Sequence, residues 1–137
     1  MMNPMIYVGT LKKYSKESGE LNKTIILKTI CEHLEMNFEE VKNRKTRLRE
    51  FAYARHLFAY FCRIYTKESF SIIGKFIHKN HATILHSNKQ ILGWLEFDEL
   101  VRNDVKKIKT QLNLKFVKTI KKERDSIAEE IILKYQN

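Results

Sequence analysis

The sequence predicts an all-α protein built around a helix-turn-helix, with extra helices at its C-terminal end. Three observations lead to this prediction. Four glycines and one proline in 137 residues leave few points at which helices must break. Apolar residues recur at helical spacing over most of the chain. Two short helical patterns, within residues 69–77 and 80–94, are joined by the polar sequence HKN, which is typical of a helix-turn-helix.

The pattern divides the chain into three parts. Residues 1–22 mix Gly, Ser, Lys and Tyr with weak periodicity, and they are predicted to form a flexible N-terminal arm. Residues 23–94 form the predicted helix-turn-helix domain, which begins with a helix capped by Asn22. Asn37 is expected to cap a short helix that runs through Val41. Residues 95–137 form a predicted helical extension.

The central helix of the domain follows a strongly basic segment. Between residues 41 and 50 there are five Lys or Arg side chains, and an apolar helix rich in Ala and aromatic residues comes next. Its predicted buried face consists of Phe51, Ala54, Phe58, Phe61, Cys62 and Tyr65, which keep helical spacing. Arg55 lies next to this face, and His56 lies away from it.

The two helices of the helix-turn-helix carry recognisable start signals. Ser69 is the predicted N-cap of the first, and Asn80 is the predicted N-cap of the second, which runs from His81 to about Trp94. Gly74 lowers helix propensity, so its presence indicates that a neighbouring helix approaches closely. The residues of the second helix expected to point inward are Ile84, Leu85, Ile91 and Leu92.

The C-terminal part contains two apolar stripes at helical spacing. The first consists of Val101, Val105, Ile108 and Leu112, and the second of Phe116, Ile120, Ile127 and Ile131. The two segments form either two helices separated near Asn113 or one long helix. We expect residues 96–112 to fold back onto the domain, and the last segment to bind another copy of the chain or a replication protein. Extension of a DNA-binding surface is the alternative role.

Charge and cysteine content limit the classes of function. The formal net charge is +10 and the isoelectric point is about 9.6, which favours polyanionic partners. No apolar run approaches the ~20 residues that span a bilayer, and no secretory signal is evident, so a cytoplasmic protein is expected. Cys31 and Cys62 lie far apart and are predicted to be buried free thiols.

The five histidines do not form a metal or catalytic pattern. His78, His81 and His86 are close in sequence, but neither a carboxylate nor a cysteine accompanies them, and His81 and His86 do not share a helical face. They also lack a partner nucleophile. We therefore expect no enzyme activity, no metal and no cofactor.

The stretch from residue 30 to residue 91 resembles the C-terminal DNA-binding domain of the bacterial replication initiator DnaA. The matching segments are ICEHLEMNFEEVKNRK, TRLREFAYARHLFAYFCRIYTKESFSIIGKFI and HKNHATILHSNKQI. That family has an Arg-rich loop, a helix with an Ala-Arg or Ala-Lys pair, the pattern SLxxIGxxF, and a closing RDH[ST]TVxHAxxKI. The resemblance implies a Trp-repressor-like helix-turn-helix that binds double-stranded DNA on the bacterial nucleoid.

The resemblance also implies roles for individual residues. Asn80, His81, Ala82 and Thr83 match family residues that open the recognition helix and meet bases or phosphates in the major groove. Arg47 matches a residue that enters the minor groove, and Arg55 and Lys89 match residues close to the DNA backbone or the groove edge. The remaining predicted phosphate contacts are Arg44, Lys45, Arg49 and Lys79, with Lys42 adding to the attraction. From its chemistry, the Asn80 amide could pair with adenine through two hydrogen bonds.

Some residues depart from the family pattern. The turn before His81 is one residue shorter, Lys79 and Asn80 replace Arg and Asp, and Ala82 replaces Ser or Thr. No Walker A motif is present, so we expect a stand-alone module without the ATPase region. The predicted function is sequence-preferring binding to a DnaA-box-like site in replication initiation or its regulation, and a phage or mobile-element origin fits the composition. The alternative is a protein-interaction adaptor or transcription regulator with only generic DNA binding.

Overall fold

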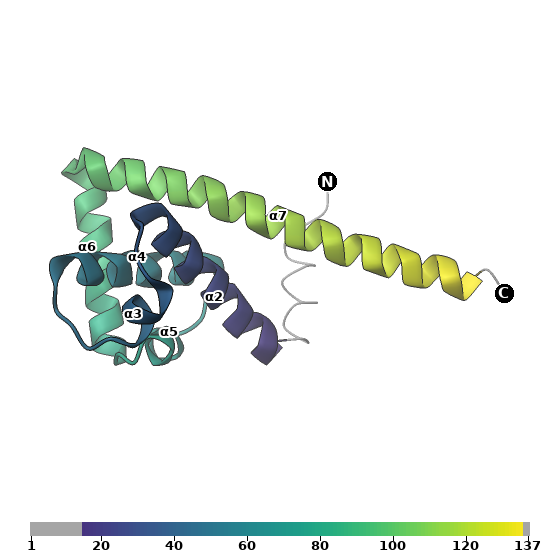
Figure 1. Cartoon of the computed structure of the whole chain (residues 1–137), viewed down its shortest axis with the longest axis horizontal. Helices are drawn as coiled ribbons and strands as arrows, with labels where there is room; N and C mark the ends of the chain where they lie inside the picture. Colours follow the sequence, from purple (N-terminus) through teal and green to yellow (C-terminus); the bar gives the residue numbers. More distant parts are fainter. Residues whose placement is uncertain (1–14, 136–137) are drawn as a thin grey trace.

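The computed structural model describes residues 15–135, and within this range it consists of α-helices without a β-strand. Figure 1 shows a small helical domain from which one long helix projects. The helices are α2 (Ser15–Leu34), α3 (Phe38–Asn43), α4 (Arg49–Tyr65), α5 (Phe70–Phe76), α6 (His81–Phe97) and α7 (Glu99–Tyr135). The all-α prediction is therefore confirmed.

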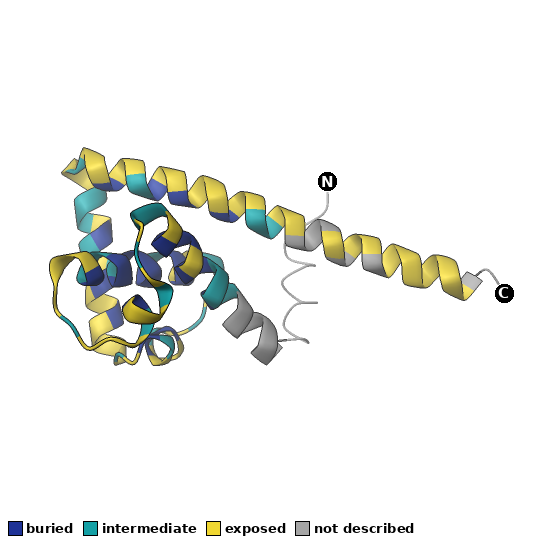
Figure 2. Cartoon of the chain, in the orientation of Figure 1, coloured by how far each residue is buried: buried dark blue, intermediate teal, exposed yellow. Residues whose placement is uncertain are grey.

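Helix α4 lies at the centre of the domain, and its apolar face forms much of the core. Phe58 and Phe61 are fully buried on it, and they pack with Ile26 and Ile30 of α2 and Ile73 of α5 in one hydrophobic cluster. The predicted face of α4 is confirmed, except that Tyr65 is only partly buried. Figure 2 shows that the buried residues lie where α2, α4, α6 and the first half of α7 face one another.

Side-chain caps explain where several helices begin. The side-chain oxygens of Asn37, Ser69 and Asn80 accept hydrogen bonds from the backbone amides of Glu40, Ile72 and Thr83, respectively. These three predicted caps are confirmed, because each satisfies an amide that the first helical turn leaves unpaired.

The beginning of α2 differs from the prediction. The helix begins at Ser15, so Asn22 lies inside it and does not cap it, and residues 15–22 are helical. The remainder of the predicted arm, residues 1–14, lies outside the described residues.

Helix α6 is longer than predicted, and its buried face is narrower than predicted. It continues to Phe97, where Asp98 caps the next helix by accepting from the amides of Leu100 and Val101. Ile84 and Ile91 are fully buried, but Leu85 and Leu92 are 38% and 49% exposed. The inward prediction for these two leucines is wrong, because each lies one residue, or about 100°, around the helix from the buried isoleucines.

Helix α7 is one continuous helix, and no break occurs near Asn113. Its first stripe is buried against the domain, as predicted for the fold-back of residues 96–112: Val101, Val105, Ile108 and Leu112. Asp104 holds this half in place, since its carboxylate accepts from the Tyr53 hydroxyl at 2.7 Å and pairs with His33 Nε2 at 2.8 Å. Beyond Phe116 the described side chains of α7 are exposed. No described helix is both long and apolar enough to cross a membrane.

Candidate nucleic-acid interface

The first turn of α6 presents a row of exposed side chains at one end of the domain. His81, Ala82 and Thr83 are all exposed, and Ile84 immediately after them is fully buried. The buried Ile84 anchors the turn, so the three preceding residues are held at the surface. A helix start of this kind offers free backbone amides and a positive dipole end, both of which favour an anion such as phosphate.

Asn80 acts as a structural cap as well as a surface residue. Its Oδ1 accepts from the Thr83 amide at 2.9 Å and from the Thr83 hydroxyl at 2.9 Å. Pairing with adenine through two hydrogen bonds needs this same oxygen as an acceptor, so it would compete with the cap. The two-bond contact stays a prediction; in this arrangement the Nδ2 amino group is the part of Asn80 that can donate to a base or phosphate.

The turn between α5 and α6 depends on Gly74. A Cβ atom at this position would lie 2.3 Å from the Lys79 carbonyl oxygen and 3.2 Å from Ile84 Cγ1. The Lys79 amide donates to the Gly74 carbonyl at 2.8 Å, which closes the turn against α5. The predicted close approach is confirmed, and both the turn backbone and α6 take part in it. Without Gly74, the first turn of α6 could not sit where it does.

The basic loop, residues 44–48, lies between α3 and α4. Arg44, Lys45 and Arg47 are exposed on it, as are Leu48 and the adjoining Arg49. No side chain of the loop is buried, so these cations are available to a polyanion. The role of this segment in contacting DNA phosphates and a groove stays a prediction.

The buried Arg55 side chain holds this loop through hydrogen bonds to backbone carbonyls and does not point to the surface. It is only 6% exposed, and its guanidinium donates to the carbonyls of Val41 at 3.0 Å, of Thr46 at 2.7 Å and of Arg44. Burial lowers the pKa of this guanidinium from its ordinary value. The DNA contact of Arg55 stays a prediction; in the structure its guanidinium donates to backbone carbonyls of α3 and of the loop. Its planar fork fixes the shape of the loop.

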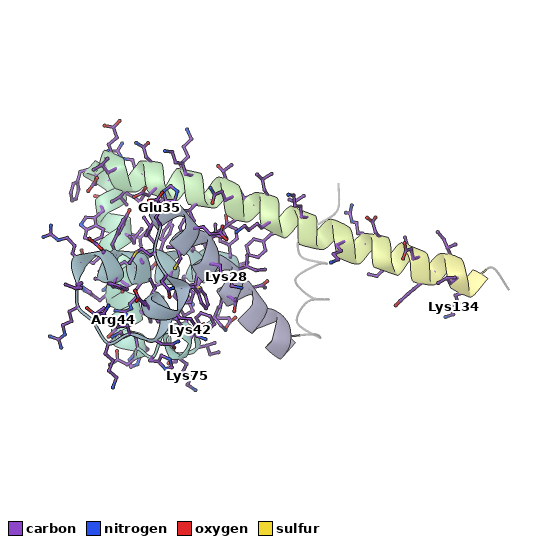
Figure 3. All side chains as sticks on the ribbon, in the orientation of Figure 1. Lys28, Glu35, Lys42, Arg44, Lys75 and Lys134 are labelled. Atoms are coloured by element: carbon purple, nitrogen blue, oxygen red, sulfur yellow. The ribbon has the colours of Figure 1, made fainter. Side chains whose placement is uncertain are left out.

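The end of α3, which leads directly into the basic loop, lies beside the end of α5 and the turn before α6. The Asn43 Oδ1 and His78 Nε2 atoms are 2.9 Å apart, and the Lys42 ammonium lies 4.5 Å from the centre of the Phe76 ring. In Figure 3, Lys42, Arg44 and Lys75 are labelled at the end of the domain away from α7, and Glu35 is labelled beside α7. The exposed cations and the first turn of α6 thus share one surface. The sequence prediction missed the contact between Asn43 and His78, because 35 residues separate them.

The other two predicted contact residues are also at the surface to different degrees. Lys89 is exposed on α6, two turns beyond the first turn, and Lys79 is partly exposed in the turn. All of the predicted contact residues except Arg55 therefore have at least part of their surface open to solvent.

His86 and His56 meet on the side of α6 that faces α4. Their rings are 6.1 Å apart in an edge-to-face arrangement, and His56 Nδ1 lies 2.7 Å from the buried Ser87 hydroxyl. Burial and then the neighbouring His86 lower the pKa of His56. His86 itself is exposed, so it combines contact with the His56 ring of α4 and access to solvent.

The cysteines and carboxylates do not form a second site in the described range. Both Cys31 and Cys62 are buried free thiols, as predicted, and burial raises the pKa of Cys31 to about 11. Among residues 15–135, no group of three or more His, Cys, Asp or Glu side chains could hold a metal ion.

Comparison with known proteins gives a consistent result. A family model described as bacterial dnaA protein helix-turn-helix matches residues 24–91. The chromosomal replication initiator protein DnaA of Bacteroides thetaiotaomicron is 40% identical over 91 residues, which cover 66% of this chain and 19% of that protein. The Bacteroides fragilis protein of the same name is 38% identical over 88 residues (64% and 18%), and that of Geotalea uraniireducens is 34% identical over 98 residues (71% and 22%). The chain thus spans about a fifth of the length of these relatives.

Proposed function

Through residues 24–91 this chain belongs to the bacterial DnaA helix-turn-helix family, and on this premise we propose that it binds double-stranded DNA with a sequence preference. Family membership supports DNA binding in replication initiation, because the matched relatives are named chromosomal replication initiators. The observation that carries the proposal is the single surface formed by the exposed first turn of α6 and the basic loop.

In the proposed complex, the N-terminal end of α6 enters the major groove. A major groove about 12 Å wide accepts one α-helix, and side chains at a helix start reach base edges. His81 donates to a guanine acceptor or a phosphate, the Ala82 methyl group contacts a thymine methyl group, and the Thr83 hydroxyl faces a phosphate. The Asn80 amide nitrogen donates at the same end of the helix.

The basic loop lies over the adjacent minor groove in this arrangement. Arg47 enters the groove, where a narrow, electronegative A·T-rich segment attracts guanidinium groups. The surrounding cations contact phosphates and add affinity without reading sequence: Lys42, Arg44, Lys45, Arg49, Lys79 and Lys89. Six such contacts predict that the logarithm of the binding constant falls with the logarithm of salt concentration with a slope of about −5.

Selection of bound sequences from a random duplex pool tests the proposal. We expect the wild type to enrich one short box, and the double variant Arg47→Ala/His81→Ala to lose this enrichment. Lys134→Ala is the matched control, since it removes a cation from the far end of α7, away from the proposed surface (Figure 3). The control should enrich the same box as the wild type.

The biological setting is part of the proposal. A DnaA-type reader of duplex DNA would act at a replication origin or in the regulation of initiation, by occupying initiator boxes. The competing function is that of an adaptor that keeps the fold and binds DNA only through charge. Binding to bulk duplex with no enriched sequence, together with the same affinity for unrelated duplexes at each salt concentration, would favour the adaptor and refute sequence reading.

A further inference from the structure

A side-chain hydrogen bond joins the segment that leads into the basic loop to the turn that leads into α6. Asn43 is the last residue of α3, directly before the loop, and His78 lies in the turn between α5 and α6. His78 Nε2 and Asn43 Oδ1 are 2.9 Å apart. The amide oxygen can only accept, so this contact is a hydrogen bond in which the protonated Nε2 of His78 is the donor.

The orientation of the Asn43 amide is fixed by a second contact. Its Nδ2 donates to the Glu39 carboxylate at 2.7 Å, and a carboxylate oxygen is an acceptor. The amide oxygen is therefore turned toward His78, and Asn43 bridges the surface of α3 and the turn. Both residues are exposed, so this bridge contributes no buried apolar surface to the core.

The backbone of His78 is strained, which sets it apart from an ordinary surface residue. Its φ angle is 59°, in the left-handed region that glycine and asparagine occupy more easily than other residues. Relief of this strain would favour glycine at position 78. The imidazole is present in spite of the strain, and the bond to Asn43 is the contact that only its side chain can supply.

We infer that Asn43 and His78 are positioning residues, which fix the basic loop relative to the first turn of α6. Arg55 sets the internal shape of the loop through its bonds to Val41, Arg44 and Thr46. The Asn43–His78 bond sets where that loop stands with respect to α6. The inference rests on the proposed function, in which the loop and α6 contact adjacent grooves of one duplex at the same time.

The consequence for binding follows from the coupling of two contacts on one rigid ligand. When the loop and α6 are held in register, contact by one brings the other to its groove at a high effective concentration. When the bridge is broken, part of the binding free energy must order the loop, so affinity falls. Neither residue needs to touch DNA for this effect.

The test compares variants that separate the hydrogen bond from the backbone strain. His78→Gly removes both, so we expect an unchanged or higher melting temperature but a Kd for duplex about threefold to tenfold higher, in the range expected for one hydrogen bond. Asn43→Ala should weaken binding by a similar factor. The double variant should bind no worse than the weaker single variant, because both changes remove the same bond.

Two further variants make the comparison specific. Glu35→Gly is the matched control, since Glu35 also has a left-handed φ angle, 56°, and lies beside α7 away from the proposed surface (Figure 3). It should leave the Kd for duplex unchanged. His78→Gln keeps an N–H donor at a similar reach, and it should restore most of the affinity that His78→Gly loses.

A measurement without DNA distinguishes failure of this inference from failure of the proposed function. The amides of Thr46 and Leu48 donate hydrogen bonds within the loop, and the amide of Arg44 donates to the Glu40 carbonyl of α3. Hydrogen exchange of these three amides should be faster in His78→Gly than in the wild type. Absence of duplex binding by the wild type would overturn the proposed function and with it the role in DNA binding. Intact binding with an unchanged Kd or unchanged loop exchange in His78→Gly would overturn this inference alone, as would additive losses in the double variant.

Discussion

Replacing Arg55 by lysine tests whether this residue is a support for the basic loop or a surface cation. The guanidinium donates to three backbone carbonyls at once and is only 6% exposed. A lysine keeps the positive charge, but its single ammonium group cannot reproduce the planar fork that reaches three separated oxygens. A surface cation that touches phosphate would tolerate this change, whereas a buried support would not.

The expected loss of stability can be worked out from the three bonds. Hydrogen bonds to a charged group contribute about 1.5–3 kcal/mol each. Lysine retains one of the three, and water can replace the donor at the loop residues Arg44 and Thr46, which are not buried, so their carbonyls lose less than the full amount. We therefore expect Arg55→Lys to lower the free energy of unfolding by about 2–3 kcal/mol, a large part of the 5–15 kcal/mol of a typical domain.

Urea denaturation followed by circular dichroism measures this change, with Arg49→Lys as the matched control. Arg49 is exposed at the start of the same helix, and its replacement should change the free energy of unfolding by less than about 0.5 kcal/mol. If Arg55→Lys unfolds at the same urea concentration as the wild type but binds duplex more weakly, the support role is refuted and direct DNA contact is restored as the explanation.

Three other predictions follow from single features of the fold. Gly74→Ala should destabilise the domain by about 1–3 kcal/mol in urea denaturation, since its Cβ would clash with the Lys79 carbonyl; Gly93→Ala, which meets no atom within 4 Å, should instead stabilise it by about 0.5–1 kcal/mol. The folded state holds the pKa of His56 below its ordinary value of 6.5, so the unfolded chain binds more protons and stability should fall as the pH drops below about 6.5; thermal melts at several pH values should show a weaker dependence in His56→Gln. Asp104→Ala removes the acceptor for Tyr53 and the partner of His33, and should lower the free energy of unfolding by about 1–3 kcal/mol and speed amide exchange in residues 99–112.

The sequence predicted those features that depend on local chemistry. The caps at Asn37, Ser69 and Asn80 were predictable because the side chain and the amide that it satisfies are three residues apart. The close approach at Gly74 was predictable because an unfavourable residue inside a helix needs a packing reason. The start of α6 at His81 was predictable because the family motif and the Asn80 cap coincide there.

The features that the sequence did not predict depend on contacts between distant segments. Burial of Arg55 requires one carbonyl from α3 and two from the loop, and nothing in the charge of an arginine indicates which way it turns. The bond between Asn43 and His78 crosses 35 residues. Leu85 and Leu92 were misplaced because periodicity gives the direction of a buried face but not its width, which depends on the neighbouring helices. The early start of α2 was missed because its first turns lack a clear apolar period.

The exposed outer half of α7 has a consequence for helix–coil equilibrium. The inner half of α7 packs on the domain through Val101, Val105, Ile108 and Leu112, so it stays helical while the domain is folded. The outer residues therefore extend an existing helix and avoid the unfavourable step of nucleating one. They must still hold about 30 Å of helix by local propensity, and none of their described side chains is buried to favour it. Their helicity should therefore melt gradually from the C-terminal end, at temperatures where the domain is still cooperatively folded. Circular dichroism of the intact chain should show this as a sloping signal before the main transition, and any ligand of that segment would be detected by the flattening of that slope.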